Sequence, residues 1–155
     1  MLLYVYYIHK EIKLQVLGGK NMKEVLNFLK SNPIQFFATI GLDKKPKVRP
    51  FQFMLEKNGK LFFCTSNQKE VCKEIKNNPY VELCSSTPAA VWVRIHGKVV
   101  FDDNINIKSE IIENNSLVKS IYQTPDNPTF EIFYLKETEA VFYDFSGNPP
   151  KKYFL

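Results

Sequence analysis

Short runs of β-branched and aromatic residues, separated by turn-forming residues, recur along this sequence and limit the folds that it can adopt. Asn58-Gly59 is the strongest turn signal, because Asn-Gly favours the type I′ turn of a two-residue hairpin. It separates an expected strand over Lys47–Glu56 from another over Lys60–Thr65. The other expected strands are Ile34–Gly41, Tyr80–Ser85, Ala90–Phe101, Phe130–Lys136 and Glu139–Phe145. Strands joined mostly by hairpins are antiparallel, so we expect a mainly β fold, either an antiparallel barrel or a tightly curled sheet, with peripheral helices.

Three helices are expected around these strands, over Met22–Asn32, Ser66–Asn78 and Asn104–Tyr122. Asn21 is the expected cap of the first helix, and Pro33 follows its end. In the second helix, Asn67 and Glu70 have the spacing of a capping box, and Asn104 is the expected cap of the third. A parallel sheet would need a helix after nearly every strand, and the pattern does not provide one.

The chain has 155 residues, of which 45% are hydrophobic, and this suits a single globular domain. We expect a domain over residues 22–147 and a tail without strand or helix pattern over 148–155. Residues 1–21 form an N-terminal extension, and Gly18-Gly19-Lys20 can be encoded by a purine-rich run that resembles a bacterial ribosome-binding site. We therefore hypothesise that Met22 is the natural start. The alternative is a genuine N-terminal strand or helix.

The charge balance and the cysteines exclude several kinds of partner. There are 21 basic and 16 acidic residues, a net charge of +5, with no block that makes a concentrated basic face. We therefore expect no nucleic-acid partner, although the aromatic strands leave an oligonucleotide-binding barrel as an alternative. No apolar run approaches the roughly 20 residues that span a membrane, so no membrane partner is expected. The 3 cysteines form no CxxC pair, which predicts a cytoplasmic protein without disulfides.

No catalytic or metal-binding motif stands out. The sequence lacks GxSxG, HExxH, a Walker loop and GxGxxG, and His9 and His96 are its 2 histidines. We therefore assign no metal site and no catalytic residue. His96 is expected to be a surface or hydrogen-bonded histidine, and Cys64 a small packing side chain.

One segment has the chemistry of a phosphate site. In Cys64-Thr65-Ser66-Asn67-Gln68-Lys69, a strand ends in two hydroxyls and a lysine occupies the first turn of a helix. Helix N–H groups, hydroxyls and an ammonium group together bind phosphate. Only 2 of the 21 basic residues are arginines, and Arg49 lies on the strand expected to pair with Leu61–Thr65, where it could bind phosphate bidentately. Pro50 cannot donate to a ladder, which predicts an edge or irregular strand beside this site.

Several motifs together resemble the pyridoxamine 5′-phosphate oxidase-like, flavin-binding split-barrel family, near its nitroimidazole-resistance branch. They are Pro46-Lys47-Val48-Arg49-Pro50-Phe51, the Gly59–Ser66 run, Lys69, Asn78-Pro79, Trp92–Gly97 and Ala140–Gly147. The resemblance implies a six-stranded antiparallel split β-barrel that forms a homodimer, with FMN at the dimer interface.

The resemblance also implies the cofactor-binding residues. Arg49 and Lys69 would bind the FMN phosphate, and Thr65 and Ser66 would donate their hydroxyls. Trp92 and Arg94 would stand near the flavin or the dimer seam. The residues that would lie along the isoalloxazine edge are Lys47, Val48, Pro50, Phe51 and Gln52.

The activity expected from this resemblance is transfer of reducing equivalents between NAD(P)H and a small acceptor. The alternative is a non-enzymatic flavin or heme-binding module, for which His96 would be the axial ligand. The chain lacks the longer C-terminal portion with which the oxidase itself grips pyridoxal phosphate, so vitamin B6 oxidation is not expected. Nitroimidazole-resistance relatives carry a histidine where this chain has Cys64, which argues against their route of reduction.

Overall fold

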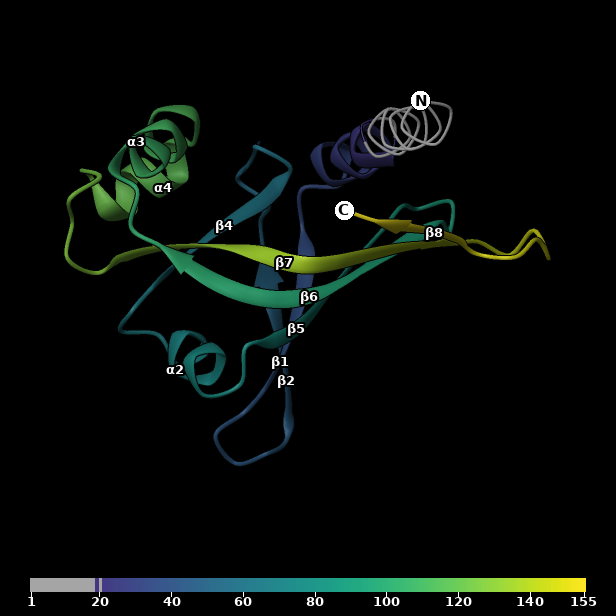
Figure 1. Ribbon diagram of the computed structural model, residues 1–155, viewed down its shortest axis with the longest axis horizontal. Helices are drawn as coiled ribbons and strands as arrows, with labels where there is room; N and C mark the ends of the chain where they lie inside the picture. The colour runs from purple at the N-terminus through teal and green to yellow at the C-terminus, as the bar shows by residue number, and fades with distance from the viewer. Residues whose placement is uncertain (1–18, 20) are drawn as a thin grey trace, which may run out of the picture.

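The computed structural model describes residue 19 and residues 21–155, and its main feature is one antiparallel sheet of 8 strands (Figure 1). The strands are β1 (Gln35–Ile40), β2 (Pro46–Phe51), β3 (Leu55–Lys57), β4 (Lys60–Ser66), β5 (Tyr80–Ser86), β6 (Trp92–Asp102), β7 (Phe130–Tyr143) and β8 (Lys151–Phe154). Their order is β2-β1-β5-β6-β7-β4-β3, and β8 pairs with β7. The expected mainly β, antiparallel fold is confirmed. The strand count differs from the expected six, and no ladder between described residues joins the end strands β2 and β3.

The prediction of one strand over Lys47–Glu56 is wrong, because this segment forms two strands, β2 and β3, at opposite ends of the sheet. β2 pairs with β1, whereas β3 pairs with β4. Pro50 has no N–H to donate, and the chain leaves the ladder over 52–54 before β3 begins. The hairpin signal itself is confirmed: Asn58 and Gly59 have φ of 52° and 75°, as a type I′ turn requires, and Lys57 faces Lys60.

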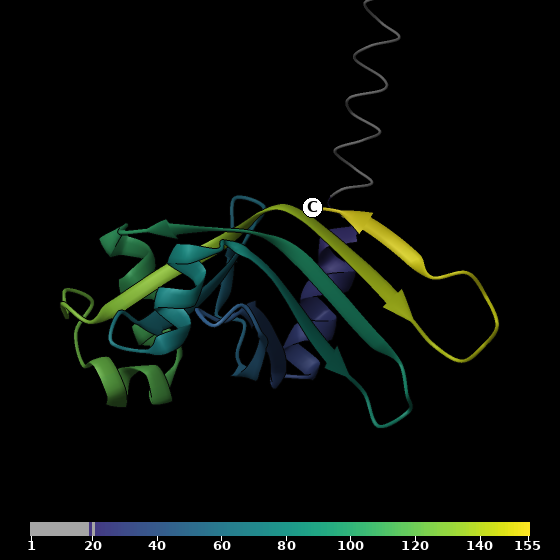
Figure 2. The same cartoon turned by 90° about the horizontal axis from the view of Figure 1, so that it is seen from below.

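The two expected strands after residue 129 form the single long strand β7. Between the pairs His96–Glu139 and Lys98–Lys136, β7 has one residue more than β6, so β7 is bulged there, and Glu137 in the bulge has φ of 55°. The segment 148–155, expected to lack regular structure, contains β8, whose pairing with Glu139–Phe142 lengthens the sheet. In Figure 2, β6, β7 and β8 run side by side.

The helices keep their expected places with different ends. Residues 21–31 are helical, so Asn21 lies inside that helix and does not cap it, whereas Asn104 caps α3 (Ile105–Asn114) as expected by accepting from the N–H groups of Asn106 and Ile107. α4 (Ser116–Tyr122) is separate from α3 because Asn115 is extended and caps α4. α2 covers Glu70–Asn77. The hypothesis of a leader over residues 1–21 lies outside the described residues, apart from Gly19 and Asn21.

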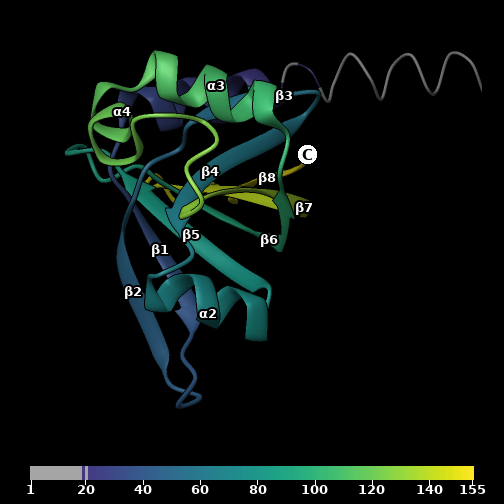
Figure 3. The same cartoon turned by 90° about the vertical axis from the view of Figure 1, so that its left-hand side faces the viewer.

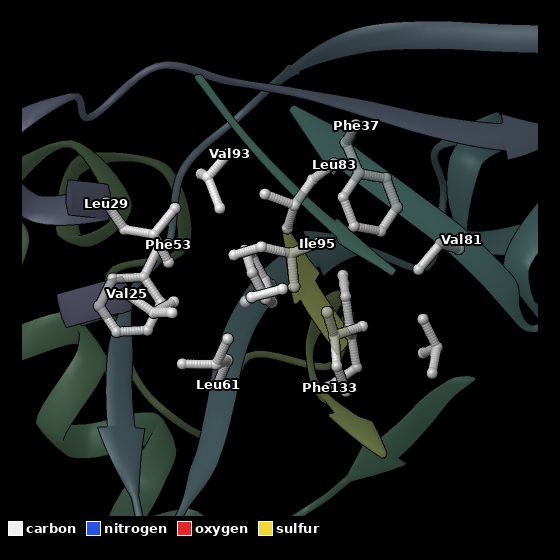
Figure 4. Close-up of a cluster of buried hydrophobic side chains, with 14 of the residues drawn as sticks. Val25, Leu29, Phe37, Phe53, Leu61, Val81, Leu83, Val93, Ile95 and Phe133 are labelled. Carbon is white, nitrogen blue, oxygen red and sulfur yellow. The ribbon is translucent and has the colours of Figure 1, made fainter. Parts of the chain in front are cut away.

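The main core lies on the inner face of the curled sheet. Val25 and Leu29 of the 21–31 helix contact it, and Phe37, Ile95 and Phe133 come from three strands (Figure 4). A second core lies on the other face of β4 and β7, where Phe62, Phe130 and Ile132 pack against α3 and α4. In the view of Figure 3, α3 and α4 lie above β4 and β5, and α2 lies below them. Among the described residues, no helix has the length and apolar character needed to cross a membrane.

Candidate functional site

A groove with Lys69 in its wall collects several of the residues expected to bind a cofactor. Its volume is about 470 Å³. Pro50, Phe51 and Gln52 line it together with Lys69. The other lining residues, which sequence analysis did not assign to a site, are Pro33, Ile34, Met54, Cys64, Leu117, Val118, Ile121 and Tyr122. We call this the Lys69 groove.

The wall that sequence analysis missed comes mainly from α4. Leu117 and Ile121 are one turn apart on this short helix and are exposed, while Val118 and Tyr122 are buried against the second core. The exposed apolar pair is the signal that could have marked this helix as part of a site. Its place beside β2 could not be known from the sequence, because the two elements are about 65 residues apart in the chain.

The Cys64 thiol and the Tyr122 phenol at this groove are held in their protonated forms. Burial raises the pKa of Cys64 to about 12, and the Lys69 charge lowers it only in part. Burial also raises the pKa of Tyr122 to about 12, with a smaller contribution from Cys64. Both groups are therefore neutral at physiological pH, and Cys64 is not a nucleophile.

No described side chain caps the N-terminus of α2, and this contradicts the expected capping box. Asn67 instead donates its side-chain amide to the Pro128 carbonyl at 2.8 Å, and its N–H binds the Thr129 carbonyl. The N-cap residue is Lys69, whose side chain makes no capping bond. A helix start of this kind favours negative charge through its N–H groups and its dipole.

The two hydroxyl residues before α2 are buried. Ser66 accepts a hydrogen bond from the Gln68 N–H at 3.2 Å, which leaves its own hydroxyl hydrogen free to donate. Thr65 Oγ1 is buried without a hydrogen-bond partner among the described residues. A buried hydroxyl without a partner is uncommon in proteins, and both residues directly precede the Lys69 turn.

Arg49 is part of an internal ion pair and does not line the Lys69 groove. Its Nη2 lies 2.7 Å from Glu74 Oε2 of α2, and its Nη1 donates to Thr39 Oγ1. Glu74 is fully buried, and Thr39 donates to the same carboxylate oxygen at 2.5 Å. The expectation that Arg49 faces Leu61–Thr65 is wrong, because β2 pairs with β1 and places Arg49 opposite Phe37.

Lys47 and Val48 also lie away from the Lys69 groove. Lys47 pairs with Asp43 at 3.1 Å across the β1–β2 turn, and this ammonium lowers the pKa of the Asp43 carboxyl. Val48 is 66% exposed and points to the opposite side of β2 from Arg49.

Trp92 and Arg94 lie on the outer face of the sheet. Residues that face one another across a ladder share a face, and register connects Val48, Ala38, Glu82 and His96 in one row. Arg94 is two residues from His96 on β6 and therefore lies on the same face, where it forms an ion pair with Glu82. Trp92 stacks on Tyr143 with ring centroids 5.3 Å apart. We use the name outer face for the exposed side of β2, β1, β5 and β6.

The outer face has a hollow of its own, with a volume of about 740 Å³. Arg94, His96 and Lys98 line it together with Tyr80 and Glu82. The residues expected to bind one cofactor are thus divided between the Lys69 groove, the α2 side of β2, the outer face and the end of β4, where Thr65 and Ser66 line neither hollow. Within the described part of the chain, no group of three or more His, Cys, Asp or Glu side chains is arranged to hold a metal ion.

Known proteins share this fold and, in part, this sequence. A family model described as pyridoxamine 5′-phosphate oxidase matches residues 22–142. The structure of a NimC/NimA family protein from Clostridium acetobutylicum is similar with 30% sequence identity and a TM-score of 0.81, over 90% of this chain and 95% of that chain. No curated protein matches the chain in sequence.

Two more distant structures share the fold. A pyridoxamine 5′-phosphate oxidase-related, FMN binding protein from Nostoc punctiforme has 18% identity and a TM-score of 0.62, over 84% of this chain and 87% of that chain. A heme binding protein from Mycobacterium smegmatis has 14% identity and a TM-score of 0.66, over 82% of this chain and 55% of that chain.

Proposed function

The chain belongs to the pyridoxamine 5′-phosphate oxidase family, and from this premise we propose that it is an FMN-binding protein with its cofactor in the Lys69 groove. One observation carries the proposal: the Lys69 ammonium group, at the N-terminus of α2, lies in the wall of a largely apolar groove. The groove volume of about 470 Å³ lies within the usual range of small-molecule sites, roughly 300–1,000 Å³. The domain expected over residues 22–147 is the cofactor-binding domain in this proposal.

The phosphate end of FMN would bind where β4 leads into α2. The Lys69 ammonium supplies the positive charge, and the start of α2 supplies N–H groups without a side-chain cap. The free hydroxyl hydrogen of Ser66 and the unpartnered hydroxyl of Thr65 are further donors. These groups fit a phosphate, because the two hydroxyls donate to no other group among the described residues and the ammonium adds positive charge.

The ring end would lie along Pro50, Phe51 and Gln52. The Gln52 amide offers both a donor and an acceptor to the polar edge of a flavin, while the α4 side chains Leu117 and Ile121 exclude water from its apolar part. Bound FMN would supply the hydride-transfer chemistry, and the protein would orient it. Cys64 and Tyr122 remain protonated, so they can donate hydrogen bonds but do not act as bases.

Arg49 does not fit a role as the main phosphate ligand in this arrangement. Two of its N–H groups are committed to Glu74 and Thr39. The Glu74 carboxylate at 2.7 Å would also repel a phosphate. We therefore assign phosphate binding to Lys69, Ser66 and Thr65, and give Arg49 the role of holding α2 on the sheet.

We further propose that the protein is a homodimer that buries the outer face. Phe36, Val48 and Tyr80 are exposed there on adjacent strands, and an exposed apolar patch of this kind is typical of a protein contact. Trp92 and Arg94 lie on the same face and would be close to the seam. Size-exclusion chromatography with light scattering should give a dimer mass, and Val48→Glu should give a monomer.

The proposed activity is transfer of reducing equivalents between NAD(P)H and a small acceptor. The second candidate is a heme-binding module, and the observation that favours it is His96 beside Arg94 and Lys98 in the hollow of the outer face. Such a site offers an imidazole for the iron and cations for heme carboxylates. The absorption spectrum of the purified protein separates the two, because flavin has two visible bands and heme one intense Soret band.

The decisive test is titration of the protein with FMN and with riboflavin, which lacks the phosphate. Lys69→Ala should weaken FMN binding about tenfold or more, since a charged hydrogen bond contributes about 1.5–3 kcal/mol, and should leave riboflavin binding unchanged. Lys73→Ala removes the same charge from an exposed position of α2 and serves as the matched control. Equal FMN affinity in the two variants would contradict the phosphate assignment, and absence of flavin binding in the unaltered protein would contradict the function.

A further inference from the structure

Gln35 is a fully buried amide at a strand position that points into the main core. Its neighbours on the inner face of β1 are Phe37, which belongs to that core, and Thr39, which is hydrogen-bonded to Glu74. Burying a polar amide opposes folding unless hydrogen bonds compensate for the lost water. An apolar side chain would fill this buried position without any need for hydrogen bonds. The role of Gln35 is therefore to be sought in the hydrogen bonds that it makes.

Gln35 bonds to three backbone groups in two segments. Its Oε1 accepts from the Phe53 N–H at 2.6 Å. Its Nε2 donates to the Asn32 carbonyl at 2.8 Å and to the Leu29 carbonyl at 3.3 Å. The carbonyls lie at the end of the 21–31 helix, where they have no partner within the helix, and Phe53 lies between β2 and β3.

The segment 52–54 that contains Phe53 belongs to neither neighbouring strand. The Met54 N–H donates to the Phe62 carbonyl at 2.9 Å, and the Phe53 N–H donates to Gln35 on the core side. On the α4 side, Asn115 donates to Gln52 Oε1 at 3.5 Å. Gln52 and Met54, on either side of Phe53, line the Lys69 groove. The position of this wall therefore depends on a side chain that does not itself line the groove.

A second buried side chain fixes the neighbouring wall. Ser85 Oγ lies 3.2 Å from the Asn32 carbonyl and 3.1 Å from the Ile34 carbonyl. Ile34 lines the groove as well. Gln35 and Ser85 thus meet at Asn32 and connect both walls to the sheet.

We propose that Gln35 is a positioning residue for the flavin site, which sets the place of Gln52 and Met54 along the bound ring through the Phe53 N–H. This inference rests on the proposed function. It predicts that loss of the Gln35 amide changes how the flavin is held, beyond any loss of folding stability. The bound cofactor should therefore report the change in its own spectrum.

The test compares Gln35→Met with Ile95→Ala in the full chain. Methionine has nearly the shape of glutamine but leaves the Phe53 N–H and the Leu29 carbonyl without partners. Ile95 is a buried core residue of β6 outside the groove, so its truncation destabilises the fold without touching the walls. At saturating FMN, Gln35→Met should change the visible circular dichroism of the flavin and raise the Kd for FMN about tenfold. Ile95→Ala should retain the original spectrum and a Kd within about twofold.

Two outcomes overturn the inference. A wild-type flavin spectrum and Kd in Gln35→Met would show that Gln35 does not position the ring, with the proposed function intact. Absence of flavin binding in the unaltered protein would overturn both. If Gln35→Met does not fold, amide hydrogen exchange of Phe53 in the unaltered protein tests the inference instead. The Phe53 amide should then exchange as slowly as core amides of β6, although it lies outside any ladder, and rapid exchange contradicts the inference.

Discussion

Removal of Arg49 should destabilise the fold far more than removal of an ordinary strand residue. Glu74 is fully buried, and its only cationic partner among the described residues is Arg49 at 2.7 Å. Breaking a buried ion pair from one side usually costs about 3–5 kcal/mol, because the remaining charge is buried without compensation. The Arg49 side chain is 24% exposed, so water can reach the gap, and we expect about 2–3 kcal/mol for Arg49→Met.

Urea unfolding followed by far-ultraviolet circular dichroism measures this effect. With a dependence on urea of about 2 kcal/mol per molar, the midpoint for Arg49→Met should fall by about 1–1.5 M. The double variant Arg49→Met with Glu74→Met removes both charges, and apolar replacement of a buried pair is often neutral. It should therefore regain most of the lost stability.

Two results would refute this reasoning. One is a midpoint for Arg49→Met within about 0.3 M of the wild type, and the other is a double variant no more stable than Arg49→Met alone. The same variants also separate folding from binding. If Arg49 holds α2 on the sheet, Arg49→Met should alter the ratio of FMN to riboflavin affinity much less than Lys69→Ala does.

Three further predictions concern the thiol, the bulge and the core. Because burial raises the pKa of Cys64 from 9.0 to about 12, the folded protein keeps a proton that the unfolded chain loses. Stability should thus be complete below pH 9 and fall as the pH rises towards 12, by up to about 1.4 kcal/mol per pH unit from this group, and Cys64→Ala should flatten the decline in urea midpoints. Gly97→Ala should lower stability by about 1–3 kcal/mol, since a Cβ there would lie 3.0 Å from the Lys136 carbonyl oxygen at the bulge; an unchanged thermal midpoint would contradict this. Phe133 is fully buried in the main core, so Phe133→Ala should cost about 3–5 kcal/mol, and a loss below 1.5 kcal/mol in the same urea assay would show that the core closes around the gap.

Sequence patterns predicted the features that depend on neighbouring residues. The turn at Asn58-Gly59 and the cap at Asn104 follow from local backbone preferences, and the structure contains both. The capping box at Asn67 was wrong, although its spacing was correct, because the Thr129 and Pro128 backbone binds Asn67 instead. A local pattern fails in this way when a distant segment offers a competing partner.

The Lys69 groove shows which parts of a site a sequence can indicate. Lys69 and the Pro50–Gln52 run were expected from the motifs, and they lie together in the groove. The α4 wall and the buried Gln35 amide were not foreseen, since their roles depend on contacts between segments far apart in the chain. Thr65 and Ser66 were expected as donors, but only the packed structure shows that Thr65 Oγ1 is buried without a hydrogen-bond partner among the described residues.

By itself the sequence determined the antiparallel strand content, the hairpin turns and the residue types available for a phosphate. These depend on interactions within a few residues, where φ preferences and alternation of side chains act directly. Only the tertiary structure decided that Arg49 pairs with Glu74, 25 residues further along the chain. It also decided how the expected ligands are divided between the groove and the outer face. Those outcomes depend on strand register and on which helix covers which edge, because a polar side chain takes whichever partner the packing brings within hydrogen-bond distance.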